Sequence, residues 1–216
     1  MGFDLYGRKP GGEDRPDDPN WDDKEQVDAY LAWQDNTDGA YFRNSVWSWH
    51  PLFDFVYKHC KDIFEKAIED ELIDFKDIDS FYTSCHHNDG VMIPEELANK
   101  ISERLDYIDT KGKLEQWEVE EDIIRERRPK EECDICNGTG TRKGWEGWHN
   151  KDTWIKLHGD LKVGPVSFKW ASEMRGCNGC QGSGKKESFK NNYKFTAENA
   201  REFSRFAKLS GGFKIW

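Results

Sequence analysis

The 216-residue sequence lacks any long apolar run, and this argues against a membrane-spanning helix. No stretch approaches the roughly 18 consecutive apolar residues that such a helix needs. The opening residues, MGFDLYGRKP, do not show the basic segment followed by an apolar one that marks a secretory leader. Cysteine is also scarce, and four of the six cysteines form two C-x-x-C pairs, which suit metal binding better than a disulfide framework. We therefore expect a cytoplasmic protein.

The sequence also lacks the short motifs of the common catalytic classes. It has no phosphate-binding loop of the G-x-x-x-x-G-K-[ST] type, no H-E-x-x-H helix and no recognisable Ser-His-Asp order. Aliphatic residues are few, since apolar residues make up 36% of the chain and charged residues 34%. Thirteen Phe, ten Trp and seven Tyr nevertheless supply large side chains for a core. These features favour a binding or accessory protein over an enzyme.

Apolar residues at helical spacing predict a mainly helical chain. The expected helices cover residues 22–34, 52–72 after Pro51, a segment opening at Pro94, 114–128, and a last helix capped by Thr196. Short strands at 3–6 and 213–216 are expected to pair. The sequence therefore predicts an α+β fold, mostly helical with four or five helices, a small sheet joining the termini and a four-cysteine zinc knuckle.

Composition along the chain predicts three parts. Residues 1–130 read as an acidic, mainly helical domain. Residues 131–190 read as a zinc-knuckle module with a hairpin insertion, because the run from 163 to 170 alternates in polarity. Residues 191–216 read as a helix and a strand that pack back on the N-terminal domain.

The strongest motif is a repeated cysteine block. Residues 133–140 read CDICNGTG and residues 177–184 read CNGCQGSG, so both follow the pattern C-x-x-C-x-G-x-G. Two residues between cysteines let both sulfurs reach one tetrahedral ion, and two blocks complete a shell of four thiolates. Such a shell leaves no position for water, which indicates one structural zinc held by Cys133, Cys136, Cys177 and Cys180. A redox-active C-x-x-C pair is the alternative, but such a pair works without a second C-x-x-C block.

The two blocks resemble the cysteine-rich zinc domain of the J-protein chaperones, whose repeat is C-x-x-C-x-G-x-G. The resemblance covers only residues 133–140 and 177–184, and implies metal ligation by the four cysteines. That family carries four such blocks, and its J-domain depends on a His-Pro-Asp tripeptide that is absent here. Co-chaperone function therefore does not carry over.

Charge is distributed unevenly along the chain. Residues 139–216 carry 15 Lys and Arg against 7 Asp and Glu, a net charge of +8. Residues 1–138 carry 17 against 35, a net charge of −18, and the two parts add up to the total of −10. The basic part is rich in aromatic rings, a combination that binds phosphates and stacks on bases. The first candidates are Arg142, Lys143, Trp145, Trp148, Lys185 and Lys186. The alternative is that the basic part docks on the acidic part, which would itself repel long nucleic acid.

Two further segments carry candidate polar groups. In YFRNSVWSWH, residues 41–50, the candidate ligand-binding residues are Arg43, Asn44, Trp47 and His50, with a helix start packed by aromatics as the alternative. In the segment from Cys85 to Gly90, His86, His87 and Asp89 could hold a second metal, or the segment could be an ordinary turn.

The MGFDLYG opening, the YFRNSVWSWHPL segment and the NDG turn together resemble a group of uncharacterised proteins of phage and bacterial genomes. The resemblance spans about the first hundred residues and implies a small accessory protein, with counter-defence in the host cytoplasm as one setting. We therefore expect a non-enzymatic, zinc-stabilised protein that binds an anionic small ligand, nucleotide-like, or a host protein. The alternative is a metal-dependent hydrolase or nuclease using His86, His87 and Asp89.

Overall fold

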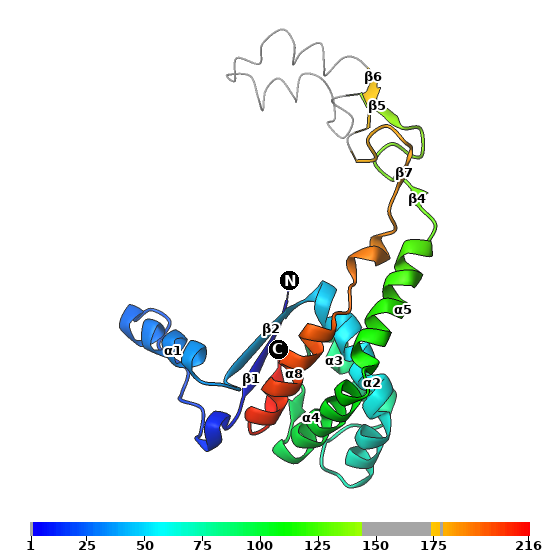
Figure 1. The fold of residues 1–216 in the computed structure, drawn as a ribbon. Coiled ribbons are helices and arrows are strands. Elements are labelled where there is room, and N and C mark those ends of the chain that lie inside the picture. Colours follow the sequence, from blue (N-terminus) through cyan, green and yellow to red (C-terminus); the bar gives the residue numbers. More distant parts are fainter. Residues whose placement is uncertain (1, 144–173, 178) are drawn as a thin grey trace. The chain divides into compact units, whose positions relative to one another are not determined.

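The computed structural model describes residues 2–143, 174–177 and 179–216. The chain forms two compact units, one of Met1–Glu126 with Asn192–Trp216 and the other of Arg127–Asn191. The described ranges contain six helices and a small antiparallel sheet that joins the two ends of the chain, and the predicted α+β class is confirmed (Figure 1). One or two helices more than the sequence predicted are present. None of the helices in these ranges combines the length and the apolarity that a membrane span requires.

The sheet of the larger unit has the strand order β2-β1-β8-β3. These strands are Gly2–Gly7 (β1), Tyr41–Ser45 (β2), Met92–Ile93 (β3) and Phe213–Ile215 (β8). The first and last strands pair antiparallel, with Leu5 opposite Ile215, as the sequence predicted. Alternate residues of β1 are buried, which turns one face of the sheet to the helices and leaves the other free for polar side chains.

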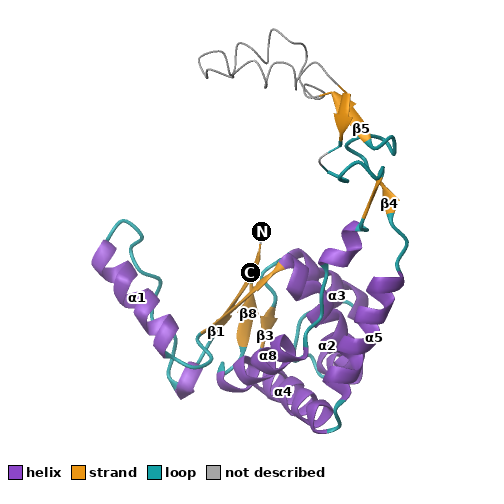
Figure 2. Ribbon diagram, turned by 45° about the horizontal axis from the view of Figure 1, so that its top comes forward, coloured by secondary structure: helices purple, strands orange, loops and turns teal. Residues whose placement is uncertain are grey.

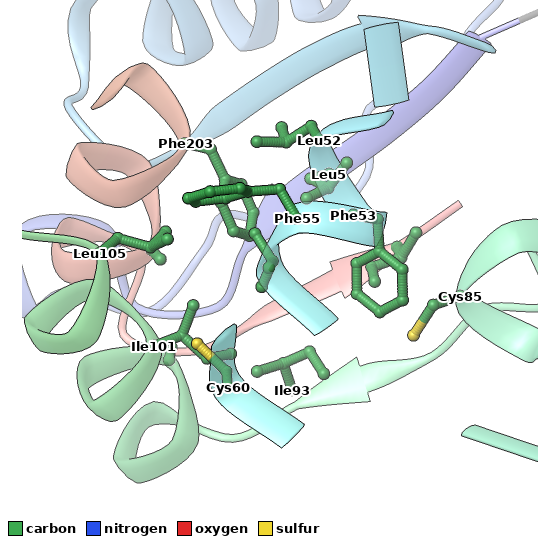
Figure 3. Packing of buried hydrophobic residues seen from close by; sticks show 14 of the residues in the cluster. Leu5, Leu52, Phe53, Phe55, Cys60, Cys85, Ile93, Ile101, Leu105 and Phe203 are labelled. Atoms are coloured by element: carbon green, nitrogen blue, oxygen red, sulfur yellow. The ribbon is translucent and has the colours of Figure 1, made fainter. Parts of the chain in front are cut away.

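Helices α2 (Val46–Glu69) and α8 (Ala197–Leu209) pack on the apolar face of the sheet, and α4 (Glu95–Thr110) packs against both of them (Figure 2). Aromatic rings fill much of this core, as in the stack of Phe53 on Trp49 with ring centroids 5.5 Å apart. Figure 3 shows Phe55, Phe203 and Leu105, which belong to this core and come from α2, α8 and α4. The many rings of the sequence thus take the place of aliphatic side chains in the core.

Helix α2 begins at Val46, earlier than the sequence predicted, and Pro51 lies inside it. Proline has no N–H to donate to the carbonyl four residues before it, and the carbonyl of Trp47 loses its usual partner. The backbone N–H of Lys194 donates to that carbonyl at 3.2 Å. Lys194, in the loop before α8, therefore satisfies the carbonyl that Pro51 leaves without a helical partner.

Helix α3 (Ile78–His87) was not expected from the sequence. It begins with a capping box, in which Asp77 accepts from the N–H of Ser80 and the Ser80 hydroxyl accepts from the N–H of Asp77. Its buried residues are Phe81 and Cys85, one turn apart. Trp49 donates its indole N–H to the carbonyl of Cys85 at 3.0 Å, which ties α3 to the core.

The remaining helices of the larger unit are α1 (Lys24–Asn36) and α5 (Lys113–Arg127), the second of which reaches the unit boundary. Helix α1 lies on the opposite side of β1 and β2 from α2, α4 and α8 (Figures 1 and 2). Asp23 caps α1, and Thr196 caps α8 by accepting from the N–H of Asn199, as predicted. A short 3-10 turn, Pro10–Gly12, follows β1, and another, Phe189–Asn192, precedes α8.

The smaller unit contains two short antiparallel strand pairs. Strand β4 (Glu131–Glu132) pairs with β7 (Lys185–Lys186), and β5 (Thr141–Lys143) pairs with β6 (Met174–Gly176). The hairpin expected at residues 163–170 lies outside the described residues. The two strand pairs flank the cysteine blocks on both sides, so that the cysteines lie where the chain turns between strands.

Candidate metal centre

The four cysteines of the two blocks converge on one point of the smaller unit. Their Sγ atoms all lie within 4.8 Å of one another, and all four side chains are buried. The Cys133 and Cys177 sulfurs are 3.9 Å apart, and the Cys136 and Cys180 sulfurs 3.7 Å apart. A disulfide would bring two sulfurs to about 2.05 Å, so the four thiols are free.

These distances fit a tetrahedral metal ion. Four sulfurs placed about 2.3 Å from a central zinc lie about 3.8 Å from one another, which is the spacing found between the two pairs. Four soft sulfur donors in a tetrahedron select zinc or iron over magnesium and calcium. The donor set therefore fits the zinc that the sequence predicted, and the four cysteines form a candidate metal-binding cluster.

The two cysteine blocks fold into equivalent loops. In each loop a backbone N–H three residues after the second cysteine donates back to the carbonyl of that cysteine, from Thr139 to Cys136 at 3.1 Å and from Ser183 to Cys180 at 3.0 Å. The hydroxyl groups of Thr139 and Ser183 donate to the same two carbonyls at 2.7 Å. The sequence analysis did not single out these hydroxyl groups, although both residues occupy the same position of the repeat, between its two glycines.

Glycine is required where the two loops approach each other. The N–H of Gly140 donates to Cys136 Sγ at 3.3 Å, and the N–H of Gly184 donates to Cys180 Sγ at 3.2 Å. Both glycines have φ of +74°, and a Cβ on Gly184 would lie 2.2 Å from the carbonyl oxygen of Gly138. The glycines thus direct N–H groups at thiolate sulfur, which stabilises the negative charge that a metal ligand carries.

Backbone hydrogen bonds join one loop to the other. The N–H of Cys133 donates to the carbonyl of Gly184 at 2.9 Å, and the N–H of Cys177 donates to the carbonyl of Gly140 at 2.7 Å. Each block therefore supplies the carbonyl that accepts a hydrogen bond from the N–H of the first cysteine in the other block. The cluster is held by its own backbone in addition to any ion that it binds.

Two of the four thiols, Cys180 and Cys136, differ in acidity. Burial opposes ionisation of Cys180, but the N–H of Gly184 and the thiols of Cys136 and Cys177 outweigh it and lower the pKa of Cys180 to about 7. Burial raises the pKa of Cys136 to about 11 despite the N–H of Gly140. Metal ligation needs thiolates, and the proton of Cys180 is therefore easier to remove than that of Cys136.

The candidate ligand-binding residues Arg43 and Asn44 lie on opposite faces of β2. The Arg43 side chain is 69% exposed, with Nε 3.5 Å from the Asp4 carboxylate. Asn44 is buried and donates its side-chain amide to Asn199 at 3.0 Å. Strand alternation separates the two, so they do not face one ligand together.

Trp47 and His50 lie in the first turns of α2 and share a neighbour. Trp47 contacts the ring of Tyr193 edge-on at 4.9 Å, and His50 stacks on the same ring at 5.7 Å. Arg142 lies in β5, whereas Trp145 and Trp148 lie outside the described residues. The binding roles predicted for these residues stay predictions.

The histidine segment does not gather into a metal site. His86 Nε2 is 3.0 Å from the Asp54 carboxylate, and its other ring nitrogen is 3.2 Å from the carbonyl of Tyr82. His86 and His87 are consecutive residues of α3 and therefore point about 100° apart. Within the described ranges, the four cysteines are the one group of His, Cys, Asp or Glu with metal-ligand spacing.

The two remaining cysteines belong to the core of the larger unit. Cys60 and Cys85 are both fully buried, and Cys60 lies on the apolar face of α2 as the sequence predicted. Burial raises the pKa of Cys60 to about 12 and that of Cys85 well above its usual value. Neither thiol is placed to ligate a metal or to act as a nucleophile.

Comparison of the chain with protein-family models, with curated proteins and with solved structures found no match in any of the three. The resemblances to J-proteins and to phage proteins thus gain no support from these comparisons, and the cysteine cluster is the feature that the structure itself establishes.

Proposed function

We propose that this chain is a non-enzymatic binding protein, stabilised by one structural zinc and directed at a small anionic, nucleotide-like ligand. The observation that carries the proposal is the completeness of the sulfur shell. Four protein thiolates at tetrahedral spacing fill every position around the ion, so no substrate or water has a place on it. An ion of this kind contributes folding free energy and leaves recognition to other parts of the chain.

The anionic character of the ligand rests on Arg43. This side chain lies on the sheet face away from the core helices and makes one long contact to Asp4. An exposed guanidinium held on a rigid strand is suited to a phosphate or a carboxylate, because its planar N–H groups can donate to two oxygens at once. Recognition of a small anion also agrees with the acidic N-terminal part, which would repel a long polyanion.

Metal analysis tests the structural half of the proposal. Protein purified without added metal is expected to contain one zinc per chain, and cobalt substitution should give the visible spectrum of a tetrahedral four-thiolate site. One iron per chain, or no metal at all, would contradict the proposed zinc.

Ligand binding and turnover test the other half. Tryptophan fluorescence and calorimetry are expected to detect binding to at least one member of a panel of mononucleotides, dinucleotides and short oligonucleotides. Hydrolysis of a phosphodiester with added magnesium or manganese, lost in His86→Ala, would instead establish the hydrolase and overturn the non-enzymatic proposal.

A further inference from the structure

The larger unit has an open groove on the face of the sheet that points away from its core helices. Its cavity measures about 750 Å³, within the range of sites that bind small molecules. All of its lining residues belong to the larger unit. Strand residues of the sheet line its floor, and residues between Arg15 and Asp35, a segment that includes most of α1, line its wall.

Side chains on the floor form two rows across the strands. In one row Tyr41 lies opposite Tyr6, and Tyr6 lies opposite Lys214. In the other row Arg43 lies opposite Asp4, which exchanges both of its backbone hydrogen bonds with Trp216. The floor thus combines three aromatic rings with two cations and one carboxylate, and these groups come from three distant parts of the sequence.

The rings of the floor present flat surfaces. Tyr6 and Tyr41 have ring centroids 5.3 Å apart, and the indole of Trp216 is 48% exposed. The Lys214 ammonium lies 3.5 Å from the centre of the Trp216 ring. Gly90 leaves room for this arrangement, because a Cβ there would lie 3.3 Å from Lys214 Cε and 3.6 Å from the Trp216 ring. An exposed indole of this kind can stack on a planar ligand.

Most negative charges of the groove are already engaged. Asp4 accepts from the Tyr41 hydroxyl and pairs with Arg43, and Asp18 pairs with Arg15. Arg15 also donates to the Tyr30 hydroxyl, so the wall cation is engaged by both Asp18 and Tyr30.

Two floor cations remain available to a ligand. Lys214 has no carboxylate within ion-pair distance among the described residues, and Arg43 is mostly exposed. Asp35 has no ion pair in these residues either, but it lies on the wall. An anion is therefore favoured at the floor and disfavoured near α1.

From this distribution we infer that the groove binds a planar heteroaromatic ring that carries a phosphate, as in a nucleoside phosphate. The ring stacks on Trp216 and the phosphate meets Arg43 and Lys214. The inference rests on the proposed function, to which it adds the place and the class of the ligand. Groove volume favours a single nucleotide over a polymer.

Calorimetry on the full zinc-loaded chain tests the inference, with adenosine monophosphate as the first probe and the other three ribonucleoside monophosphates beside it. The double variant Arg43→Gln with Lys214→Gln should weaken binding about tenfold for each charge removed. Trp216→Ala should weaken it about tenfold through loss of stacking. Adenosine and inorganic phosphate should each bind more weakly than the monophosphate.

A matched control is available in the same unit. Arg205 has the same side-chain exposure as Arg43 and also pairs with one aspartate, and Lys58 lies over the Trp117 ring at 4.0 Å. The double variant Arg205→Gln with Lys58→Gln makes the same change in charge outside the groove and should bind as wild type. Circular dichroism melts establish that both double variants are folded.

The remaining outcomes separate the two proposals. If the monophosphate binds equally to both double variants, the groove is not its binding site, and the proposed function still stands. The same conclusion follows if only another anion of the panel binds. Phosphate binding as tightly as the monophosphate would overturn the stacking of a ring. Absence of binding to every anion at millimolar concentration would overturn both.

Discussion

Replacing Cys180 by Ser should unfold the described part of the smaller unit and leave the larger unit folded. In the described part of the smaller unit, the buried hydrophobic cluster consists of the four cysteines alone. The larger unit has its own core, which runs from Phe3 on β1 to Ile215 on β8. Because apolar burial is the main driving force for folding, only the smaller unit depends on the ion.

The magnitude follows from the chain that the ion closes. Cys133 and Cys177 are 44 residues apart, and a cross-link of that length removes about 4 kcal/mol of chain entropy from the unfolded state. Structural four-thiolate sites add their own binding free energy, often about 10 kcal/mol or more. No apolar core in the described residues of the smaller unit can replace these contributions. From sequence alone one expects loss of the C-terminal half, but α8 and β8 pack in the larger core and should survive.

Hydrogen exchange read by mass spectrometry measures this directly. Peptides around β4–β5 and β6–β7 should lose protection in Cys180→Ser, whereas peptides of α2, α4 and α8 should keep it. The thermal midpoint of the larger unit should fall by less than about 4 °C. Cys60→Ala is the matched control, since it removes a buried thiol of the core and should retain the zinc. Loss of protection throughout α2 and α8 in Cys180→Ser would refute the independence of the larger core.

Three further predictions concern single groups. Gly184→Ala should weaken zinc binding at least tenfold, measured by competition with a chromophoric chelator, because its Cβ would lie 2.2 Å from a carbonyl oxygen. Gly112→Ala is the control and should leave zinc binding unchanged, because Gly112 also has a positive φ, +65°, but no atom lies within 4 Å of its Cβ position. Trp49→Phe should lower the free energy of unfolding in urea by about 3 kcal/mol, because it leaves a cavity and an unpaired buried carbonyl. Burial and the charge of His86 lower the pKa of His50 below 6.5, so as the pH falls the unfolded chain binds a proton at this histidine before the folded chain does. The free energy of unfolding should therefore fall as the pH drops below about 6.5. Urea titrations at several pH values should show a shallower fall in His50→Gln.

The sequence predicted those elements whose signals are local. Helices α2, α4 and α8 follow from apolar spacing and from caps such as Thr196, and the cysteine cluster follows from the spacing within and between its blocks. Helix α3 carried a local signal that was overlooked, since Asp77 and Ser80 form a capping box and Phe81 and Cys85 recur one turn apart.

The groove could not be predicted in the same way. Strand β2 is defined by its register against β1, where Leu5 lies opposite Phe42, and β3 has only two residues. Pairing of β1 with β8 then brings Trp216 beside Asp4, which are separated by nearly the whole chain. Local sequence patterns compare residues that are near one another in the chain, so they do not reveal such neighbours. For that reason Arg43 was the one floor residue that the sequence marked as a candidate for ligand binding.

The equivalence of the two cysteine loops has a consequence for how each loop is completed. Among the described residues, the backbone hydrogen bonds that hold the two loops together lie within residues 131–143 and 174–186, and β5 pairs with β6 beside the cluster. Neither loop is complete without the other, because a loop alone lacks both the backbone acceptor for its first cysteine and two of the four sulfurs.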